Sequence, residues 1–166
     1  HFIQSRNEAL AYAVARMPAT YGAVYSALNY SLNGLEDPLS DITSLIDIGA
    51  GTGSATWAAN ELLALNSNMC IEYDEFMKNL GKALMAHNTD LSGKTQWKSL
   101  NIVTDDIPGK ADLVIASYVL NELRENEQQE IADKLWGLAK KLLLFVETGT
   151  PDGFRVLNRI REKLLK

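Results

Sequence analysis

Apolar residues along this chain follow two alternating patterns, short continuous runs and longer stretches with helical spacing. The short runs predict strands at about 44–48, 68–72, 96–101, 111–117 and 142–147. The almost continuous apolar content of 111–117 is typical of a strand covered on both faces of a sheet. The spaced stretches predict helices at about 54–66, 75–88, 125–140 and 151–166, with a loop at 91–94. Such alternation indicates an α/β fold with a parallel, doubly wound sheet, and right-handed crossovers give the strand order 3-2-1-4-5.

A helical extension precedes the predicted sheet. Ser5 and Glu8 fit a capping box, and an apolar helical face follows them. Pro18 ends or redirects this helix and can also begin a second one, which we expect to stop near residues 33–34. A linker at residues 36–40 then leads into the sheet. We therefore predict an N-terminal helical extension, 1–40, and a Rossmann-like domain, 41–166.

The turn after the first predicted strand is rich in glycine. Gly49, Gly51 and Gly53 occupy alternate positions, and Glu72 ends the second strand nineteen residues past Gly53. A dinucleotide fingerprint needs Gly or Ala at position 54, where Ser54 stands, and the lysine of a phosphate-binding loop is also missing. A nucleoside cofactor's ribose is held by this arrangement, which runs from a strand through a glycine turn and a helix to a second strand that ends in a carboxylate. The alternative is a tight turn without a ligand, with Glu72 as a solvated strand end.

With Asp47 before it, the glycine turn resembles motif I of class I S-adenosylmethionine (SAM) methyltransferases. The resemblance implies SAM as cofactor, with bare main chain against its methionine part and its carboxylate near the N-terminus of the following helix. Glu72 would accept both ribose hydroxyls. The cofactor-binding residues predicted at this point are Asp47, Gly49, Ala50, Gly51, Gly53, Glu72 and Tyr73. A complete class I sheet has two more strands after the fifth, so either they lie outside this chain or the sheet is a reduced one.

The end of the third predicted strand marks the expected adenine side of the site. We predict that Asn101 and Ile102 contact the adenine, because class I methyltransferases usually make this contact there. An acidic residue is usual at that point, so Asn101 departs from the pattern, and Asp105 and Asp106 are alternatives. The other interpretation of Asn101 is a simple cap of the strand end.

Ser117 and Tyr118 end the fourth strand, and Asn121 and Glu122 follow them. Many amino-directed nucleic-acid methyltransferases carry Asn/Asp-Pro-Pro-Tyr/Phe here, which holds the target amine and stacks on the flipped base. That motif is absent from this chain. We predict that Ser117 and Tyr118 contact the cofactor and that Tyr118 and Asn121 are catalytic, by stacking and hydrogen bonding. The alternative is that they only form the rim, and Glu122 is either a general base or the start of a helix.

Composition limits the partners. The net charge is −5, which argues weakly against nucleic acid, but residues 155–166 carry a net +4. This basic end either meets phosphate or simply forms a well-solvated last helix. Cys70 is the single cysteine, so we expect a reducing compartment and no cysteine-rich metal site in this segment. No apolar run reaches the roughly 18–20 residues of a membrane span, so we expect no membrane partner. Because the chain begins at His1, we expect a fragment or a processed chain.

Four stretches in order carry a more specific resemblance. They are Arg-Met-Pro-Ala-Thr-Tyr at 16–21, Asp-Ile-Gly-Ala-Gly-Thr-Gly at 47–53, Ala-Ser-Tyr-Val-Leu-Asn-Glu-Leu at 116–123 and Glu-Thr-Gly-Thr-Pro-Asp-Gly-Phe at 147–154. Together they resemble the methyltransferase-like proteins of mitochondrial small-ribosomal-subunit assembly and their bacterial relatives. Members of that family usually continue into a cysteine-rich region thought to bind an iron–sulfur cluster or zinc, which this sequence does not reach.

This resemblance implies a SAM-dependent methyltransferase acting on ribosomal RNA of the small subunit, in mitochondria for a eukaryotic relative and in the cytoplasm for a bacterial one. Arg16 and Tyr21 would then close over the methionine end of the cofactor, or else pack within the helical extension. Two alternatives remain at this point. One is a non-catalytic assembly factor that binds SAM, and the other is a methyltransferase of small molecules, which the acidic body of the chain favours.

Overall fold

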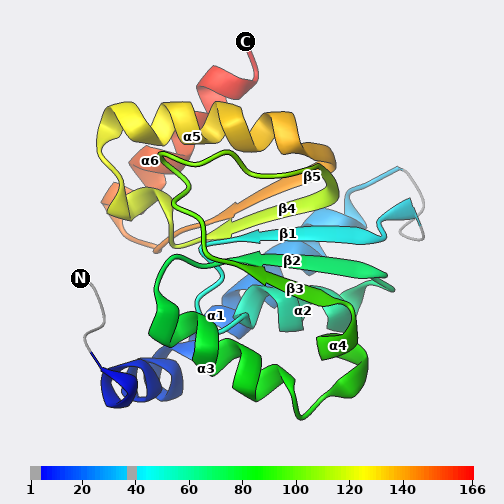
Figure 1. Ribbon diagram of the computed structural model, residues 1–166. Coiled ribbons are helices and arrows are strands. Elements are labelled where there is room, and N and C mark those ends of the chain that lie inside the picture. The colour runs from blue at the N-terminus through cyan, green and yellow to red at the C-terminus, as the bar shows by residue number, and fades with distance from the viewer. Residues whose placement is uncertain (1–4, 37–40) are drawn as a thin grey trace.

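The computed structural model of this chain describes residues 5–36 and 41–166. His1 and most of the predicted linker, residues 37–40, lie outside the described residues. The described part forms three layers, with a parallel sheet between two layers of helices (Figure 1).

Five parallel strands form the sheet in the order β3-β2-β1-β4-β5, which confirms the predicted topology. The strands are β1 (Ser44–Ile48), β2 (Ser67–Ile71), β3 (Thr95–Lys98), β4 (Ala111–Ser117) and β5 (Ala139–Val146). Chain order reverses at β1, since β2 and β4 flank it on its two sides. Because all strands run the same way, their carboxyl ends meet at one edge, and ligands of such sheets bind at the reversal point.

Helices cover both faces of the sheet (Figure 1). One face carries α1 (Arg6–Asn33), α2 (Ser54–Leu62), α3 (Glu75–Met85) and the short α4 (Thr89–Gly93), and the other carries α5 (Glu125–Leu138) and α6 (Pro151–Leu164). Side chains of β1 alternate between the two layers. Leu45 packs toward α1 and α2, whereas Ile46 and Ile48 pack toward α5 and α6.

The prediction that Pro18 ends or redirects the first helix is wrong. Residues 6–33 form one α-helix with Pro18 inside it. Proline removes the N–H that would bond to the Val14 carbonyl, but both residues lie on the exposed side of the helix, where water can hydrate that carbonyl. The second half of the helix buries Val24, Leu28 and Leu32 in the core it shares with α2, and this packing holds the helix in one piece.

Several element boundaries also differ from the predicted ones because of tertiary packing. The predicted loop at 91–94 is wrong at its start, because α4 forms with Asn88 capping the N–H of Leu91, and Leu91 is buried. The second helix of the chain ends at Leu62 and not near 66, since the backbone becomes extended at Leu63 and buries Leu63 and Leu65. The third strand ends at Lys98 and not at 101. A 3-10 helix, η2 (Leu120–Glu122), which was not predicted, follows β4.

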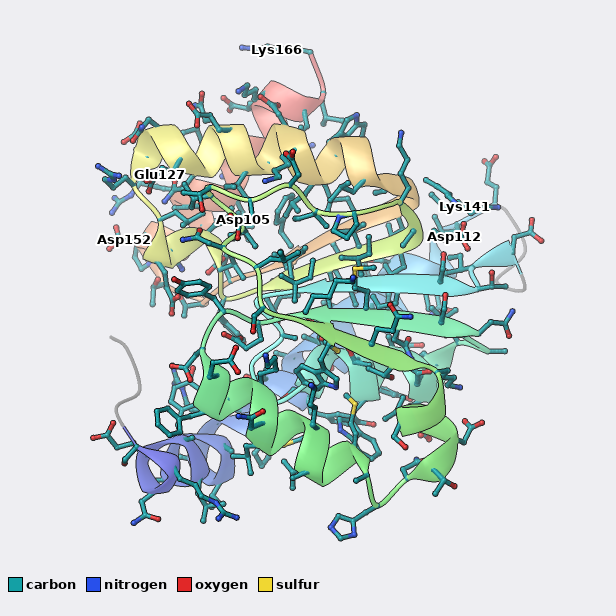
Figure 2. The ribbon with its side chains drawn as sticks, in the orientation of Figure 1. Asp105, Asp112, Glu127, Lys141, Asp152 and Lys166 are labelled. Carbon is teal, nitrogen blue, oxygen red and sulfur yellow. The ribbon has the colours of Figure 1, made fainter. Side chains whose placement is uncertain are left out.

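The connection from β3 to β4 crosses the sheet without a helix. Lys134 of α5 donates to the carbonyls of Ile102 and Asp105, so one half-buried lysine fixes the connection against the helix layer. Asp105 lies beside the α5 layer in Figure 2, at the end of the sheet opposite to Asp112 and Lys141. Asp112 accepts from Ser44 and from Thr43 at the start of the sheet, far from the carboxyl edge.

The basic last helix is largely neutralised by its neighbours. Arg159 pairs with Glu125 at 3.0 Å and Lys163 pairs with Asp133 at 2.6 Å, both across to α5. Cations that are already paired with carboxylates have less to gain from phosphate, so the structure favours the solvated-helix interpretation of residues 155–166. Among the described residues, no helix combines the length and the apolar content needed to cross a bilayer.

We expect Gly81→Ala to destabilise the fold. A Cβ at Gly81 would lie 2.4 Å from the Trp97 ring and 3.1 Å from the Thr52 backbone, so α3 would have to move away from the sheet. Overpacking of this kind costs about 1–3 kcal/mol. The matched control is Gly137→Ala in α5, where nothing lies within 4 Å of the added atom, and better helix propensity should leave stability equal or raised. Urea unfolding of both variants checks this, and equal midpoints would contradict it.

Candidate functional site

The glycine turn at the carboxyl end of β1 adopts a backbone that favours glycine at three positions. Gly49, Gly51 and Gly53 have φ of 61°, 58° and 88°. Side chains rarely tolerate these values, which lie in the left-handed region. The turn lets the chain pass from β1 directly into α2, whose N-cap is Gly53.

Two of the three glycines are also required by close packing, and the third is open. A Cβ at Gly49 would lie 2.7 Å from the Val119 methyl, and one at Gly53 would lie 2.5 Å from the Met85 methyl. A Cβ at Gly51 would have only the Met77 methyl within 4 Å, at 3.6 Å, which is an ordinary van der Waals distance. Gly51 is therefore the glycine of the turn where an added side chain would be least crowded.

Glu72 binds this main chain from the neighbouring strand end. Its Oε2 accepts the Gly51 N–H at 2.7 Å, and its Oε1 accepts the Asp74 N–H at 2.8 Å. Burial raises the pKa of the Glu72 carboxyl, the two backbone bonds oppose that rise, and the nearby Asp74 and Glu122 add to it. Each carboxylate oxygen keeps a lone pair beyond the N–H it accepts, so the group can still accept two hydroxyls.

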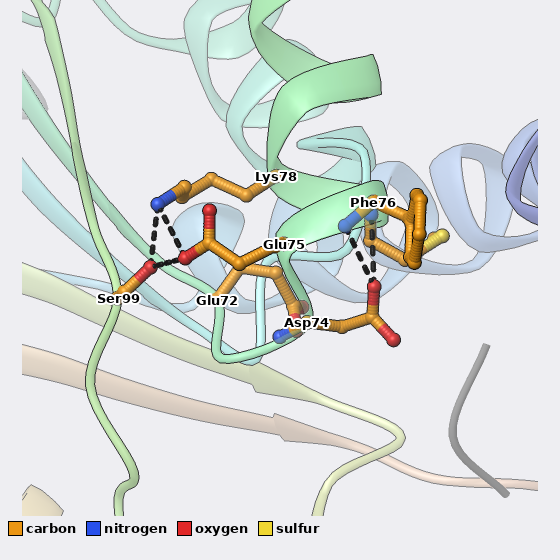
Figure 3. Close-up of polar contacts among 7 residues, drawn as sticks. Glu72, Asp74, Glu75, Phe76, Lys78 and Ser99 are labelled. Carbon is orange, nitrogen blue, oxygen red and sulfur yellow. Dashed lines mark hydrogen bonds and ion pairs between the residues drawn. The ribbon is translucent and has the colours of Figure 1, made fainter. Parts of the chain in front are cut away.

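The start of α3 anchors the turn that carries Glu72 (Figure 3). Asp74 caps the helix by accepting the Phe76 N–H at 2.9 Å. Lys78 pairs with Glu75 at 2.8 Å, and Ser99, just after β3, hydrogen-bonds to both. These contacts tie the end of β2 to the end of β3. Tyr73, between Glu72 and Asp74, has an exposed fraction of 57% and lies free at the rim.

Asp47 lies beneath the glycine turn and not on its surface. Its Oδ2 accepts the Thr56 N–H at 3.1 Å and the Thr56 hydroxyl at 2.7 Å, whereas its Oδ1 is buried without a partner in the described chain. Burial raises the pKa of Asp47 to about 7, although both Thr56 bonds lower it. The side chain thus joins β1 to the first turn of α2. Ala50 is also buried, and its N–H donates to Ile71 at 2.9 Å.

The segment after β4 carries backbone strain that the sequence did not reveal. Tyr118 has φ of 57°, the single positive value at a non-glycine position of the described chain. Such a conformation costs on the order of 1–3 kcal/mol and needs support from its surroundings. The Tyr118 N–H donates to Val146 of β5 at 2.7 Å, and Val119 packs on Gly49. Ser117, immediately before, is half-buried.

Glu147 supplies much of that support, a role the sequence analysis missed. From the end of β5 its Oε1 accepts the Leu120 N–H at 2.8 Å, and its Oε2 accepts Nδ2 of Asn121 at 2.7 Å. Burial raises the pKa of Glu147, the bonds from the 119–121 segment lower it, and nearby Glu122 raises it. The signal available in the sequence was a carboxylate placed directly after β5, the strand that neighbours β4.

Other predicted residues are less tightly joined to the glycine turn. Asn101 uses its side-chain oxygen for the Val103 N–H at 2.9 Å, which is the cap that was the alternative to an adenine contact. Ile102 packs partly against the core under α5. Arg16 is exposed on α1, and Tyr21 stacks on Tyr25 with ring centroids 6.0 Å apart. None of these side chains has a hydrogen bond to the glycine turn among the described residues.

Carboxylates dominate the electrostatics of the site. Beyond the effect of burial, Asp74 and Glu122 raise the pKa of Glu72, and Glu122 also raises that of Glu147, so negative charge gathers at the ends of β2 and β5. A cationic ligand would relieve this repulsion. Residues 5–36 and 41–166 contain no group of three or more His, Cys, Asp or Glu side chains placed to hold a metal ion.

Comparisons with known proteins agree with this geometry. The family described as mitochondrial small ribosomal subunit Rsm22 matches residues 6–166. The human mitochondrial ribosome assembly protein METTL17 is 28% identical over 165 residues, covering 95% of this chain and 35% of that protein. The Rsm22-cox11 tandem protein 2 of Schizosaccharomyces pombe mitochondria is 29% identical over 168 residues, covering 96% of this chain and 22% of that protein. The chain thus spans about a third or less of the curated relatives it matches.

Solved structures share the fold at low identity. The glycopeptide N-methyltransferase MtfA in complex with SAM has a TM-score of 0.60 and 12% identity, covering 74% of this chain and 53% of that one. Human N-acetylserotonin methyltransferase in complex with SAM has a TM-score of 0.59 and 16% identity, covering 82% and 36%. The chain therefore has the Rossmann-like fold of class I methyltransferases.

We expect the buried Asp47 to make stability depend on pH. Its folded pKa of about 7 lies above the value of about 3.9 for an unfolded aspartate. Between these values the folded chain holds a proton that the unfolded chain has lost, so this group's contribution to the free energy of unfolding falls as pH rises from about 4 to 7. The stability of the wild type relative to Asp47→Asn should fall over that range in urea titrations.

The matched control is Asp112→Asn. Burial raises the pKa of Asp112, but bonds from Thr43 and Ser44 outweigh burial and leave it lowered. Its contribution is therefore present above about pH 4 and is lost only in more acidic solution. The difference between wild type and Asp112→Asn should be flat between pH 4 and 7, and a flat difference for Asp47→Asn as well would contradict our assignment.

Proposed function

Because the chain belongs to the Rsm22 family of mitochondrial small ribosomal subunit proteins, we propose that it is the SAM-binding part of a methyltransferase acting on ribosomal RNA of the small subunit. The observation that carries the proposal is the bond between the Gly51 N–H and the Glu72 carboxylate. It joins bare main chain at the end of β1 to a two-oxygen acceptor at the end of β2, at the reversal point of the sheet.

Each part of SAM has a matching group at this edge. Glu72 would accept the two ribose hydroxyls with the lone pairs its N–H partners leave open. The open side of Gly51 would receive the methionine arm, and the N-terminus of α2 favours its carboxylate. Asn101, Ile102 and Tyr73 would flank the adenine. Asp47 would support the turn from below through Thr56, and direct contact with the ligand is not needed for that role.

The net charge of the cofactor also fits. SAM carries a sulfonium and an ammonium against one carboxylate, so it is cationic overall. Glu72 and Glu147 lie at the strand ends on the two sides of β1, and both have a raised pKa. A cation between them stabilises their ionised forms.

Bound SAM would supply an electrophilic methyl group for direct displacement by a nucleophile. The residues of this chain then have to align the two reactants and exclude water, since this reaction requires no covalent help from the protein. Tyr118 and Asn121 line the acceptor side, where Tyr118 would stack on the target and Asn121 would hydrogen-bond to it. Ser117, at the end of β4, would contact the cofactor. Arg16 and Tyr21 of α1 would cover the methionine end.

We keep the predicted division at residue 40, with residues 1–40 as an extension and 41–166 as the SAM-binding domain. The extension is not independent, because α1 shares a hydrophobic cluster with α2 and the sheet. The compartment follows from the source of the protein, the mitochondrion in a eukaryote and the cytoplasm in a bacterium.

A non-catalytic assembly factor that binds SAM is the second candidate. Two observations favour it. The human relative is named a ribosome assembly protein, and the Asn/Asp-Pro-Pro-Tyr/Phe motif is absent after β4. In that case the cofactor would act through stability, because a ligand that binds only the folded state stabilises it. A methyltransferase of small molecules is supported only by the acidic body of the chain.

Calorimetry with SAM should show one site that Glu72→Ala weakens strongly. The variant loses the acceptor of two ribose hydroxyls, and hydrogen bonds to a charged group contribute about 1.5–3 kcal/mol each. With two such bonds lost, we therefore expect an affinity at least about 100-fold lower. Glu61→Ala, which removes an exposed carboxylate from α2, is the matched control and should bind normally. No heat of binding with the wild type at millimolar SAM would end the proposal.

Methyl transfer separates the two main candidates. We expect the chain, or the longer protein that contains it, to transfer a labelled methyl group from SAM to small-subunit particles purified from cells that lack the protein. Asn121→Ala should reduce transfer while SAM affinity stays within a factor of about two, because Asn121 makes no contact with the glycine turn. SAM binding with no transfer to these particles would favour the assembly factor.

A further inference from the structure

The side-chain amide of Asn121 is held in one orientation by the end of β5. Its Nδ2 donates to Oε2 of Glu147 at 2.7 Å and to the Thr148 hydroxyl at 3.3 Å. Its Oδ1 takes no hydrogen bond within the described residues, and the residue is exposed. Both donor positions of the amide are thus used inside the protein, and its acceptor is left open.

The Asn121 amide cannot easily flip, because its hydrogen-bond partners Glu147 and Thr148 are fixed. An ionised carboxylate only accepts hydrogen bonds, so it selects the Nδ2 side of the amide. The Glu147 carboxylate is itself held, since its other oxygen accepts the Leu120 N–H at 2.8 Å. Thr148 in turn contacts the Thr150 hydroxyl at 3.0 Å.

Packing behind Thr148 explains why the 147–154 motif contains its second glycine. A Cβ at Gly153 would lie 2.1 Å from the Thr148 carbonyl oxygen, so the first turn of α6 can approach only without a side chain there. Thr150 caps α6 by accepting the Gly153 N–H at 3.2 Å. The motif after β5 is therefore a rigid support for the Asn121 amide.

Asn121 lies on the turn that packs against the candidate cofactor site. Val119, two residues earlier, packs on Gly49, and Tyr118 has the strained backbone described above. A strained, doubly supported turn beside a binding site is typical of a segment that must present a group in a fixed position.

We infer that Glu147 and Thr148 are positioning residues that hold Asn121 with Oδ1 as the open acceptor, and that the methyl-accepting group is a hydrogen-bond donor, an amine or a hydroxyl. The inference rests on the proposed function and adds the chemistry of its substrate. Oδ1 accepts one hydrogen of the target, which aims the lone pair of the nitrogen or oxygen toward the methyl carbon. As the new bond to that carbon forms, the sulfur–methyl bond breaks with its electrons remaining on sulfur, and the target releases a proton to water.

The orientation can be tested by nuclear magnetic resonance on the 15N-labelled chain. The Asn121 amide signals are assigned by their loss in Asn121→Ser. We expect their exchange with water to be at least about ten-fold faster in Glu147→Gln, because a bond to a charged acceptor is lost. Thr148→Val removes the weaker acceptor and should give a smaller increase. Glu122→Gln, a neighbouring carboxylate with no bond to Asn121, is the control and should change nothing.

Several results would overturn this assignment. Wild-type Asn121 signals at the positions of a free amide would do so, as would exchange that is unchanged in both Glu147→Gln and Thr148→Val. Thr148→Val is included because its side chain is exposed, so the test survives if Glu147→Gln unfolds. Backbone spectra of each variant report whether it is folded.

The donor character of the substrate is tested with the chain saturated by S-adenosylhomocysteine. Adenosine and cytidine, which carry free amines, are titrated against their N,N-dimethylated forms, which cannot donate. We expect the amines at millimolar concentration to shift the Asn121 signals with an affinity at least about ten-fold higher than the dimethylated forms. Equal shifts, or no shift by either amine, would overturn the inference. Failure of S-adenosylhomocysteine to bind in calorimetry would instead overturn the proposed function.

Discussion

The bond between the Gly51 N–H and the Glu72 carboxylate is the contact on which the rest of the site depends. Gly51 has φ of 58°, a backbone that favours glycine, and its N–H donates to a half-buried carboxylate at the end of the next strand. Burial raises the free energy of the ionised carboxylate, and the two N–H bonds offset part of that cost. The remaining lone pairs point to a ligand that donates hydroxyls and carries positive charge. Together with the bond from the Ala50 N–H to the Ile71 carbonyl at 2.9 Å, the bond from Gly51 to Glu72 joins the turn after β1 to the end of β2.

Much of the architecture could be predicted because its signals are local. Short runs between the helical stretches predicted all five strands, and the right-handed crossover rule gave their order. The sequence predicts bare main chain at Gly49, Gly51 and Gly53, and all three have a left-handed backbone that favours glycine. The prediction at Pro18 was wrong because tertiary packing outweighed the local tendency of proline to end a helix. The buried second half of α1 stabilises a continuous helix more than the missing hydrogen bond at an exposed turn destabilises it. Helix α4 was missed for the same reason, since it forms to bury Leu91.

The acceptor side of the site could not be predicted in this way. The positive φ of Tyr118 leaves no mark on the sequence, because tyrosine is not a residue that favours that conformation. The contacts of Glu147 reach residues 26 and 27 positions earlier in the chain, and they become visible only once β4 and β5 are paired. Asp47 was correctly placed in the glycine motif, but its burial beneath Thr56 depends on the packing of α2. Sequence spacing predicted the glycine turn, whereas the contacts of the segment after β4 are visible only in the fold.

The cofactor side and the acceptor side of the proposed site are built by different strand pairs. Their separate construction bears on whether the family is catalytic. The cofactor side comes from β1 and β2, supported by Asp47 below and by α3 at the edge. The acceptor side comes from β4 and β5, supported by Glu147. The two sides meet where β1 pairs with β4 and where Val119 packs on Gly49. Substitutions that release Asn121 would therefore remove methyl transfer and leave SAM binding in place, while loss of Glu72 would remove both. A protein that has become an assembly factor would keep the first side and drift at the second. In this chain the turn after β4 combines a strained tyrosine, whose N–H is bonded to the end of β5, with an amide held by two acceptors, and such a fixed second side is what the proposed methyl transfer would require.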